Sequence, residues 1–300
     1  MNLNRLVKAS LRTDPGRVRD HNEDFVISRE PTSGEDETQN GWLYIVADGV
    51  GGADAGEIAS QFASESTVKH YVDNHDIADP GERLRESMRS ANKDLRQLVV
   101  DRGNYARMAT TMVAVVIRDQ QAYISNVGDS RGYHLRNGEF RQITKDQSLV
   151  ARLVEEGAIT EAEAAVHPRK NVILYSLGSE RDPRIDLFEQ PLEPSDILLL
   201  CSDGLTRHVS DQEISEIISS AEPETAARYL IDLSNKRGGE DNISAAILHF
   251  NPKPSAVKKN ANSEPARQVK QSKRSMWVLT VVLSLLQTFL IVLVWLLLSV

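Results

Sequence analysis

The chain has 300 residues, enough for one large domain or two small ones, and its formal net charge of −8 argues against a nucleic-acid-binding protein. The single cysteine, Cys201, excludes an intramolecular disulfide framework and fits a reducing compartment. Cys201 lies in the apolar run "ILLLCSDG" and is predicted to be a buried small hydrophobe. No Cys/His cluster suggests a zinc site.

The N-terminal half combines short apolar segments with longer helical patterns. Residues 28–41 are polar and are predicted to form a surface loop. The stretch "YIVADGVGGADAGEIAS" begins as an apolar strand that ends on Asp48, and a helical pattern follows its glycines. Pro80 opens a segment with apolar residues at helical spacing. Short β-branched segments between turn residues predict strands over residues 25–28, 41–48, 110–117 and 121–129.

The C-terminal half continues the same alternation, with strands predicted over residues 131–144, 196–204 and 242–250. Asn137-Gly138 predicts a tight hairpin inside the first of these segments, and residues 118–121 predict another. Ser210 and Glu213 form the pattern of a capping box. Antiparallel strands with separate helices predict an α+β fold of packed sheets with helices outside, forming one domain over residues 1–250.

The C-terminal tail has a different composition. Residues 276–300 are uncharged and apolar, long enough to cross a bilayer with some tilt, and Trp277 and Trp295 lie near the two ends. Residues 251–275 form a polar, basic linker, and its lysines and arginines place that side in the cytoplasm by the positive-inside rule. The sequence therefore predicts a cytoplasmic domain anchored to the cell membrane by one C-terminal transmembrane helix.

Acidic residues recur where the predicted strands begin or end. Asp48, Asp129 and Asp203 each follow a strand, Asp241 precedes one, and Glu23-Asp24 stands just before another. A single Asp-Gly pair is most often a plain turn. Five such sites together favour a cluster of carboxylates whose repulsion divalent cations relieve, and ligands of oxygen alone suit Mg²⁺ or Mn²⁺.

Two arginines, Arg17 and Arg19, stand just ahead of the acidic pair in "GRVRDHNED". A guanidinium beside a metal site suits a phosphate, because its two N–H groups bind two oxygens at once. Solvated arginines paired with nearby acids are an equally simple interpretation.

Five motifs, "RDHNED", "VADGVGG", "GDSRGY", "LLCSDGL" and "EDNIS", follow one another in the order and spacing of the PP2C-type metal-dependent protein phosphatases, the PPM family. The segment "ITKDQSLVARLVEEGAITEAEAAVHP" resembles the bacterial branch, in which it leads into a flap beside the site. The resemblance extends from about Ser10 to Phe250. It implies a β-sandwich of two antiparallel sheets flanked by helices, with a binuclear Mn²⁺ or Mg²⁺ centre in a cleft at its edge.

The resemblance also implies a role for each motif residue. Asp48 matches the carboxylate that bridges both ions, and Gly49 matches the residue whose carbonyl binds one of them. The remaining assignments are Asp203 and Asp241 on the first ion, Glu23 on the second with Asp24 behind it, Asp129 with Asp203 on a weaker third ion, and Arg19 on the substrate phosphate.

The implied reaction is hydrolysis of phosphoserine or phosphothreonine in proteins by a hydroxide that bridges two ions. Val50 occupies the position where some relatives carry a histidine considered as a proton donor, so the general acid stays unassigned. A phospho-binding scaffold without catalysis and a phosphatase for small esters or for phosphorylated anti-sigma-factor antagonists are the alternatives. The expected partners are phosphoproteins, a separate Ser/Thr kinase with targets at the membrane, and the bilayer, with no nucleic acid.

Overall fold

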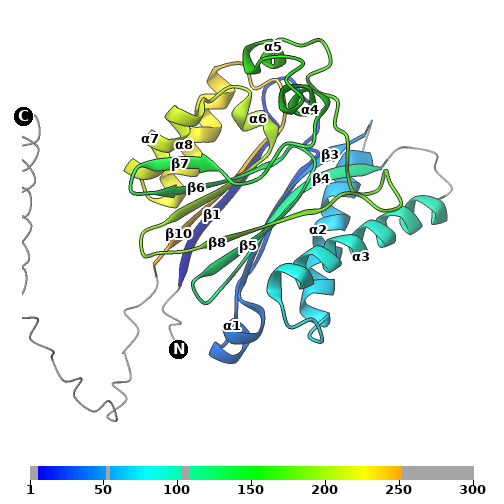
Figure 1. Ribbon diagram of the computed structural model, residues 1–300, viewed down its shortest axis with the longest axis vertical. Helices are drawn as coiled ribbons and strands as arrows, with labels where there is room; N and C mark the ends of the chain where they lie inside the picture. The colour runs from blue at the N-terminus through cyan, green and yellow to red at the C-terminus, as the bar shows by residue number, and fades with distance from the viewer. Residues whose placement is uncertain (1–5, 52–54, 103–107, 252–300) are drawn as a thin grey trace, which may run out of the picture. The chain divides into compact units, whose positions relative to one another are not determined.

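Two antiparallel sheets form the centre of the structure, a computed structural model that describes residues 6–51, 55–102 and 108–251 (Figure 1). One sheet has the strand order β1-β10-β9-β6-β7, and the other has the order β2-β3-β4-β5-β8. The bounds of the first sheet are β1 (Val7–Asp14), β10 (Ile243–Phe250), β9 (Ile197–Cys201), β6 (Arg131–Arg136) and β7 (Glu139–Gln142). Those of the second are β2 (Asp24–Arg29), β3 (Trp42–Val50), β4 (Ala109–Arg118), β5 (Gln121–Val127) and β8 (Asp186–Pro191).

Helices cover the outer faces of both sheets, which gives four layers (Figure 1). On the second sheet lie α2 (Ala55–Asp73) and α3 (Pro80–Asp101), and on the first lie α7 (Asp211–Ser220) and α8 (Pro223–Lys236). The chain between β7 and β8 carries α4 (Leu149–Glu155) and α5 (Glu161–Ala165). Two short helices complete the described set, α1 (Gly34–Asn40) and α6 (Asp203–Thr206).

The alternation of side chains along each central strand builds two cores at once. In β3, Leu43 and Ile45 face α2 and α3, whereas Tyr44 and Val46 lie between the two sheets. The same division occurs in β4, β9 and β10. Because both faces of these strands are covered, most of their residues are apolar, as expected for strands buried on two sides.

The predicted strands, the two hairpins and the α+β class are confirmed. Asn137 and Gly138 both adopt positive φ angles, 52° and 84°, in the turn between β6 and β7. Asp119, with φ of 58°, lies in the turn between β4 and β5, where Arg118 pairs with Gln121. The capping box of Ser210 and Glu213 opens α7 as predicted.

Some elements differ from the prediction, and the short helices α4, α5 and α6 were not predicted. The surface loop expected over residues 28–41 contains α1, because the Ser33 side chain accepts a hydrogen bond from the Asp36 amide and caps a helix. The prediction of a continuous loop over residues 28–41 was therefore wrong. Strands β1 and β8 were not predicted; each lies at the edge of its sheet, where the burial of side chains is irregular.

Of the linker predicted over residues 251–275, only Asn251 is among the described residues, and the transmembrane helix predicted over residues 276–300 lies outside them. Among the helices that the structure does describe, none combines the length and apolar character needed to cross a membrane.

Candidate active site

The acidic residues singled out from the sequence gather at one end of the sandwich, where strands of both sheets begin or end. Asp24 is the first residue of β2, and it pairs directly with Asp48 near the end of β3. Two carboxylates in a cross-strand pair repel one another. The sheet register therefore forces two like charges together, an arrangement that needs a compensating cation or proton.

The other sheet contributes Asp203 and Asp241. Asp203 follows β9 and opens α6, and Asp241 stands two residues before β10. Hydroxyl and amide groups beside them join the two sheets. The Ser202 hydroxyl donates to Asp24 Oδ2 at 2.7 Å, and the Glu23 amide donates to Asn242 Oδ1 at 2.8 Å.

Glycines bring the backbone close to the acidic residues. A Cβ on Gly49 would lie 2.3 Å from the Gly56 carbonyl oxygen and 2.6 Å from that of Glu23, so position 49 requires glycine for close packing. A Cβ on Gly56, in the first turn of α2, would lie 2.7 Å from the Glu23 Cδ. Gly56 therefore provides the space that the Glu23 carboxylate occupies.

Burial and mutual repulsion dominate the electrostatics. Burial raises the pKa of Asp48 well above its ordinary value, and the charges of Asp24, Asp203, Asp129 and Asp241 raise it further. Burial likewise raises the pKa of Asp24 and of Asp129 to about 7 each, with the charge of Asp203 adding to both. Burial also raises the pKa of Glu23 and of Asp203. Each of these carboxyls therefore makes its neighbours harder to ionise.

Two arginines approach the cluster. Arg19 Nη2 lies 2.8 Å from Asp241 Oδ1. Arg207, which directly follows α6, pairs with Asp203 Oδ2, and its Nη1 lies 3.2 Å from Asp241 Oδ2. Arg17 instead donates its backbone amide to the Gly239 carbonyl.

The donor set fits a divalent cation. Three buried carboxylate oxygens, Asp24 Oδ1, Asp129 Oδ1 and Asp203 Oδ1, have no hydrogen-bond partner. Oxygen-only ligands of this kind suit Mg²⁺ or Mn²⁺. Among the described residues, no group of three or more His, Cys, Asp or Glu side chains already has the geometry of a metal site.

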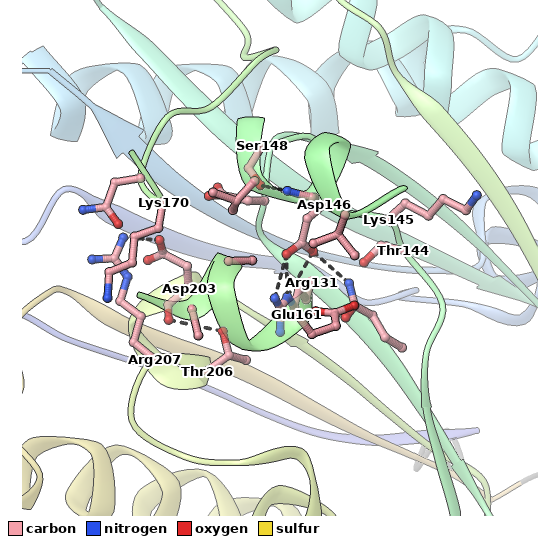
Figure 2. A pocket seen from close by; sticks show the side chains of 18 of the residues that line it. Arg131, Thr144, Lys145, Asp146, Ser148, Glu161, Lys170, Asp203, Thr206 and Arg207 are labelled. Carbon is pink, nitrogen blue, oxygen red and sulfur yellow. Dashed lines mark hydrogen bonds and ion pairs between the residues drawn. The ribbon is translucent and has the colours of Figure 1, made fainter. Parts of the chain in front are cut away.

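A pocket of about 710 Å³ opens beside the cluster, between α6 and the segment that carries α4 and α5 (Figure 2). Its lining includes Asp129, Asp203 and Arg207, together with Lys170 from the segment after α5. A volume of this size suits a small ligand or a substrate side chain.

The structure therefore brings together Glu23, Asp24, Asp48, Asp203 and Asp241, with Gly49 beside them. Asp129 joins the cluster from the end of β5, and Arg19 reaches it through Asp241. Val50 is exposed at the end of β3. The sequence analysis did not predict four further residues of the site: Ser202, Asn242, Gly56 and Arg207. The first three stand inside the sequence stretches quoted above, and Arg207 stands two residues after "LLCSDGL".

Comparison with known proteins decides the family, because the family model of protein phosphatase 2C matches residues 32–242. The chain belongs to the protein phosphatase 2C family. It is accordingly an enzyme, a protein phosphatase.

Relatives within this family are similar over most of the chain. The serine/threonine phosphatase stp of Listeria monocytogenes is 39% identical over 245 residues, covering 80% of this chain and 94% of that protein. The Mycobacterium tuberculosis serine/threonine phosphatase PstP/Ppp has a crystal structure with a TM-score of 0.73 and 34% identity, over 82% of this chain and 99% of that one. The catalytic domain of PstP in complex with two manganese ions has a TM-score of 0.71 over the same shares.

Proposed function

We propose that this protein phosphatase hydrolyses phosphoserine and phosphothreonine esters of proteins with the help of Mn²⁺ or Mg²⁺ held by the acidic cluster. The observation that carries the proposal is the convergence of six carboxylates from both sheets, three of which leave a buried oxygen without a partner. The names of the relatives, serine/threonine phosphatases, and the two manganese ions of PstP support the same substrate class and cofactor.

The ligands proposed for two core ions follow the motif positions. Asp48 would bridge both ions and the Gly49 carbonyl would bind one of them. Asp203 and Asp241 would bind the first ion and Glu23 the second. Asp24 would lie behind Glu23, next to the second ion. The Ser202 hydroxyl donates to Asp24 Oδ2, and Asp24 Oδ1 has no hydrogen-bond partner. Asp129, whose Oδ1 is also free, would join Asp203 in holding a weaker third ion.

When bound, such ions supply a hydroxide nucleophile near neutral pH and neutralise charge on the phosphoryl group. The chain's own part is to bind and orient the ester. Arg19 is half-exposed beside Asp241, where its guanidinium can bind two phosphate oxygens and stabilise the spread negative charge of the transition state.

The described residues also limit which covalent route is available. Cys201 is fully buried, and burial raises the pKa of its thiol to about 12, so it remains protonated and out of reach of a substrate. Val50 has no proton to donate to the leaving oxygen. Direct attack by water on phosphorus, without a phosphocysteine intermediate, is the route that fits these side chains.

The test is hydrolysis of a phosphothreonine peptide by the whole protein with Mn²⁺ and with chelator. We expect turnover with Mn²⁺, and its loss with chelator and in the Asp48→Asn and Asp203→Asn variants. Asp232→Asn, on the exposed face of α8, is the control and should leave turnover unchanged. No turnover from folded protein with bound Mn²⁺ would reject the proposed activity.

We also propose that residues 276–300 anchor the phosphatase to the cytoplasmic face of the cell membrane, where its substrates and a separate Ser/Thr kinase would then be found. The uncharged apolar composition of this stretch and the basic residues before it support the proposal. Fractionation of cells that produce the whole chain should place it with the membranes, and a chain ending at residue 250 should stay in the soluble fraction. Recovery of both forms in the soluble fraction would contradict the anchor.

A further inference from the structure

Arg207 is a cation built into the acidic cluster. It directly follows α6, four residues after Asp203, so its side chain returns over the first turn of that short helix and pairs with Asp203 Oδ2. The same guanidinium reaches Asp241, with Nη1 3.2 Å from Oδ2. One side chain thus neutralises two carboxylates from different elements, both of them proposed ligands of the first ion.

The two oxygens of the Asp203 carboxylate have different surroundings. Oδ2 is held by Arg207, whereas Oδ1 is buried and has no hydrogen-bond partner. Asp241 is occupied on both oxygens, by Arg19 on Oδ1 and by Arg207 on Oδ2. A divalent ion that binds Asp203 and Asp241 must therefore share them with, or take them from, the Arg207 guanidinium.

Arg207 also forms part of the wall of the pocket (Figure 2). Two other basic residues of the lining face carboxylates outside the acidic cluster: Arg131 makes hydrogen bonds of 2.6–3.0 Å to the Asp146 carboxylate, and Lys145 lies 3.7 Å from Glu155. Figure 2 shows Arg207, Asp203 and Lys170 at one end of the pocket, away from the Arg131–Asp146 pair. A phosphate that enters the pocket toward the acidic cluster meets Arg207 there.

We propose that Arg207 acts as an internal counter-ion of the metal site: it lowers the affinity of Asp203 and Asp241 for divalent cations and binds the phosphate group of a ligand in the pocket. The inference rests on the proposed metal-dependent function. Its physical basis is the sign of the charge, because a fixed positive charge beside the site repels a second cation and attracts an anion. Arg207 is only 27% exposed, so solvent weakens both effects only in part.

The first measurement is calorimetric titration of Mn²⁺ into metal-free whole protein. We expect Arg207→Gln to bind Mn²⁺ about tenfold more tightly than the wild type, because the competing charge is gone. Arg207→Lys keeps the charge and should stay close to the wild type. Arg85→Gln, which breaks a similarly exposed pair with Glu82 on α3, is the matched control and should have no effect.

The second measurement is titration of inorganic phosphate into the Mg²⁺-loaded proteins. Arg207→Gln should bind phosphate about tenfold more weakly, and Arg207→Lys should retain most of the affinity. A variant that only disturbs folding would weaken both ligands, whereas the proposal requires opposite changes. Unchanged or weaker Mn²⁺ binding by Arg207→Gln, or unchanged phosphate binding, would overturn it.

The two titrations separate this inference from the proposed function. Hydrolysis of the phosphothreonine peptide by the wild-type protein tests the function alone. If the wild type hydrolyses the peptide and Arg207→Gln leaves both affinities unchanged, the function stands and the role of Arg207 is rejected. If the wild-type protein binds no Mn²⁺ at all, the proposed function and this inference fail together.

Discussion

Gly56 shows how one residue without a side chain can determine the position of another. It lies in the first turn of α2, and the Glu23 carboxylate occupies the space where a Cβ would be, with Oε1 only 2.8 Å from that point. Alanine is the better helix former, so helix propensity alone would favour it at this position. Contact with Glu23, a proposed ligand, explains why glycine stands there.

We predict that Gly56→Ala leaves the protein folded and weakens Mn²⁺ binding about tenfold, because the new methyl group displaces the Glu23 carboxylate. Calorimetric titration with Mn²⁺ measures the change. Gly34→Ala is the matched control, since a Cβ there meets nothing within 4 Å. Equal Mn²⁺ affinity in Gly56→Ala and the wild type would show that Glu23 tolerates the methyl group.

At the scale of elements, most of the predicted strands have two buried faces or a decisive turn; the edge strand β2 has neither and was predicted from its short apolar segment alone. The central strands β3, β4, β9 and β10 are nearly continuous apolar runs, a pattern visible in the sequence. β7 has exposed residues and only four positions, yet the Asn137-Gly138 turn predicts it. β1 and β8 are edge strands without such a turn or a regular alternation, and the sequence carries no comparable signal for them.

The β6–β7 turn gives an element-scale prediction. Gly138 has φ of 84°, and a Cβ there would meet nothing within 4 Å, so Gly138→Ala changes only backbone strain. We expect a loss of about 1–2 kcal/mol in the free energy of unfolding, or roughly 2–4 °C in Tm per kcal/mol. Thermal unfolding measures it, again with Gly34→Ala as control. A Tm equal to that of the wild type would mean that the turn adopts another conformation.

At the scale of the whole molecule, the candidate site exists only because the two sheets are packed together. Asp24 and Asp48 come from one sheet, Asp203 and Asp241 flank strands of the other, and Ser202 and Asn242 hydrogen-bond across the junction. The sequence motifs could identify the carboxylates as candidate metal ligands, since each stands at a recognisable strand end. They could not reveal Arg207, because its contact with Asp241 depends on how α6 lies beside the start of β10.

The same convergence makes the stability of the metal-free protein depend on pH. Burial and neighbouring charges raise the pKa values of Asp24 and Asp129 from 3.8 to about 7 in the folded state. Between these values the folded protein binds more protons than the unfolded chain, so stability is greatest on the acidic side and falls as pH rises through about 7. Deprotonation leaves adjacent buried negative charges whose repulsion Arg207 offsets only in part.

We therefore predict that the Tm of the metal-free protein falls by several degrees between about pH 5 and pH 8. Asp24→Asn, which cannot ionise, should flatten this dependence. Mn²⁺ should raise the Tm most at pH 8, where the carboxylates are free of protons, by an amount that grows with the logarithm of its concentration. Thermal unfolding with chelator and with Mn²⁺ measures both effects. A metal-free Tm that stays constant or rises over this range would contradict the raised pKa values, because repulsion among buried carboxylates requires the opposite sign.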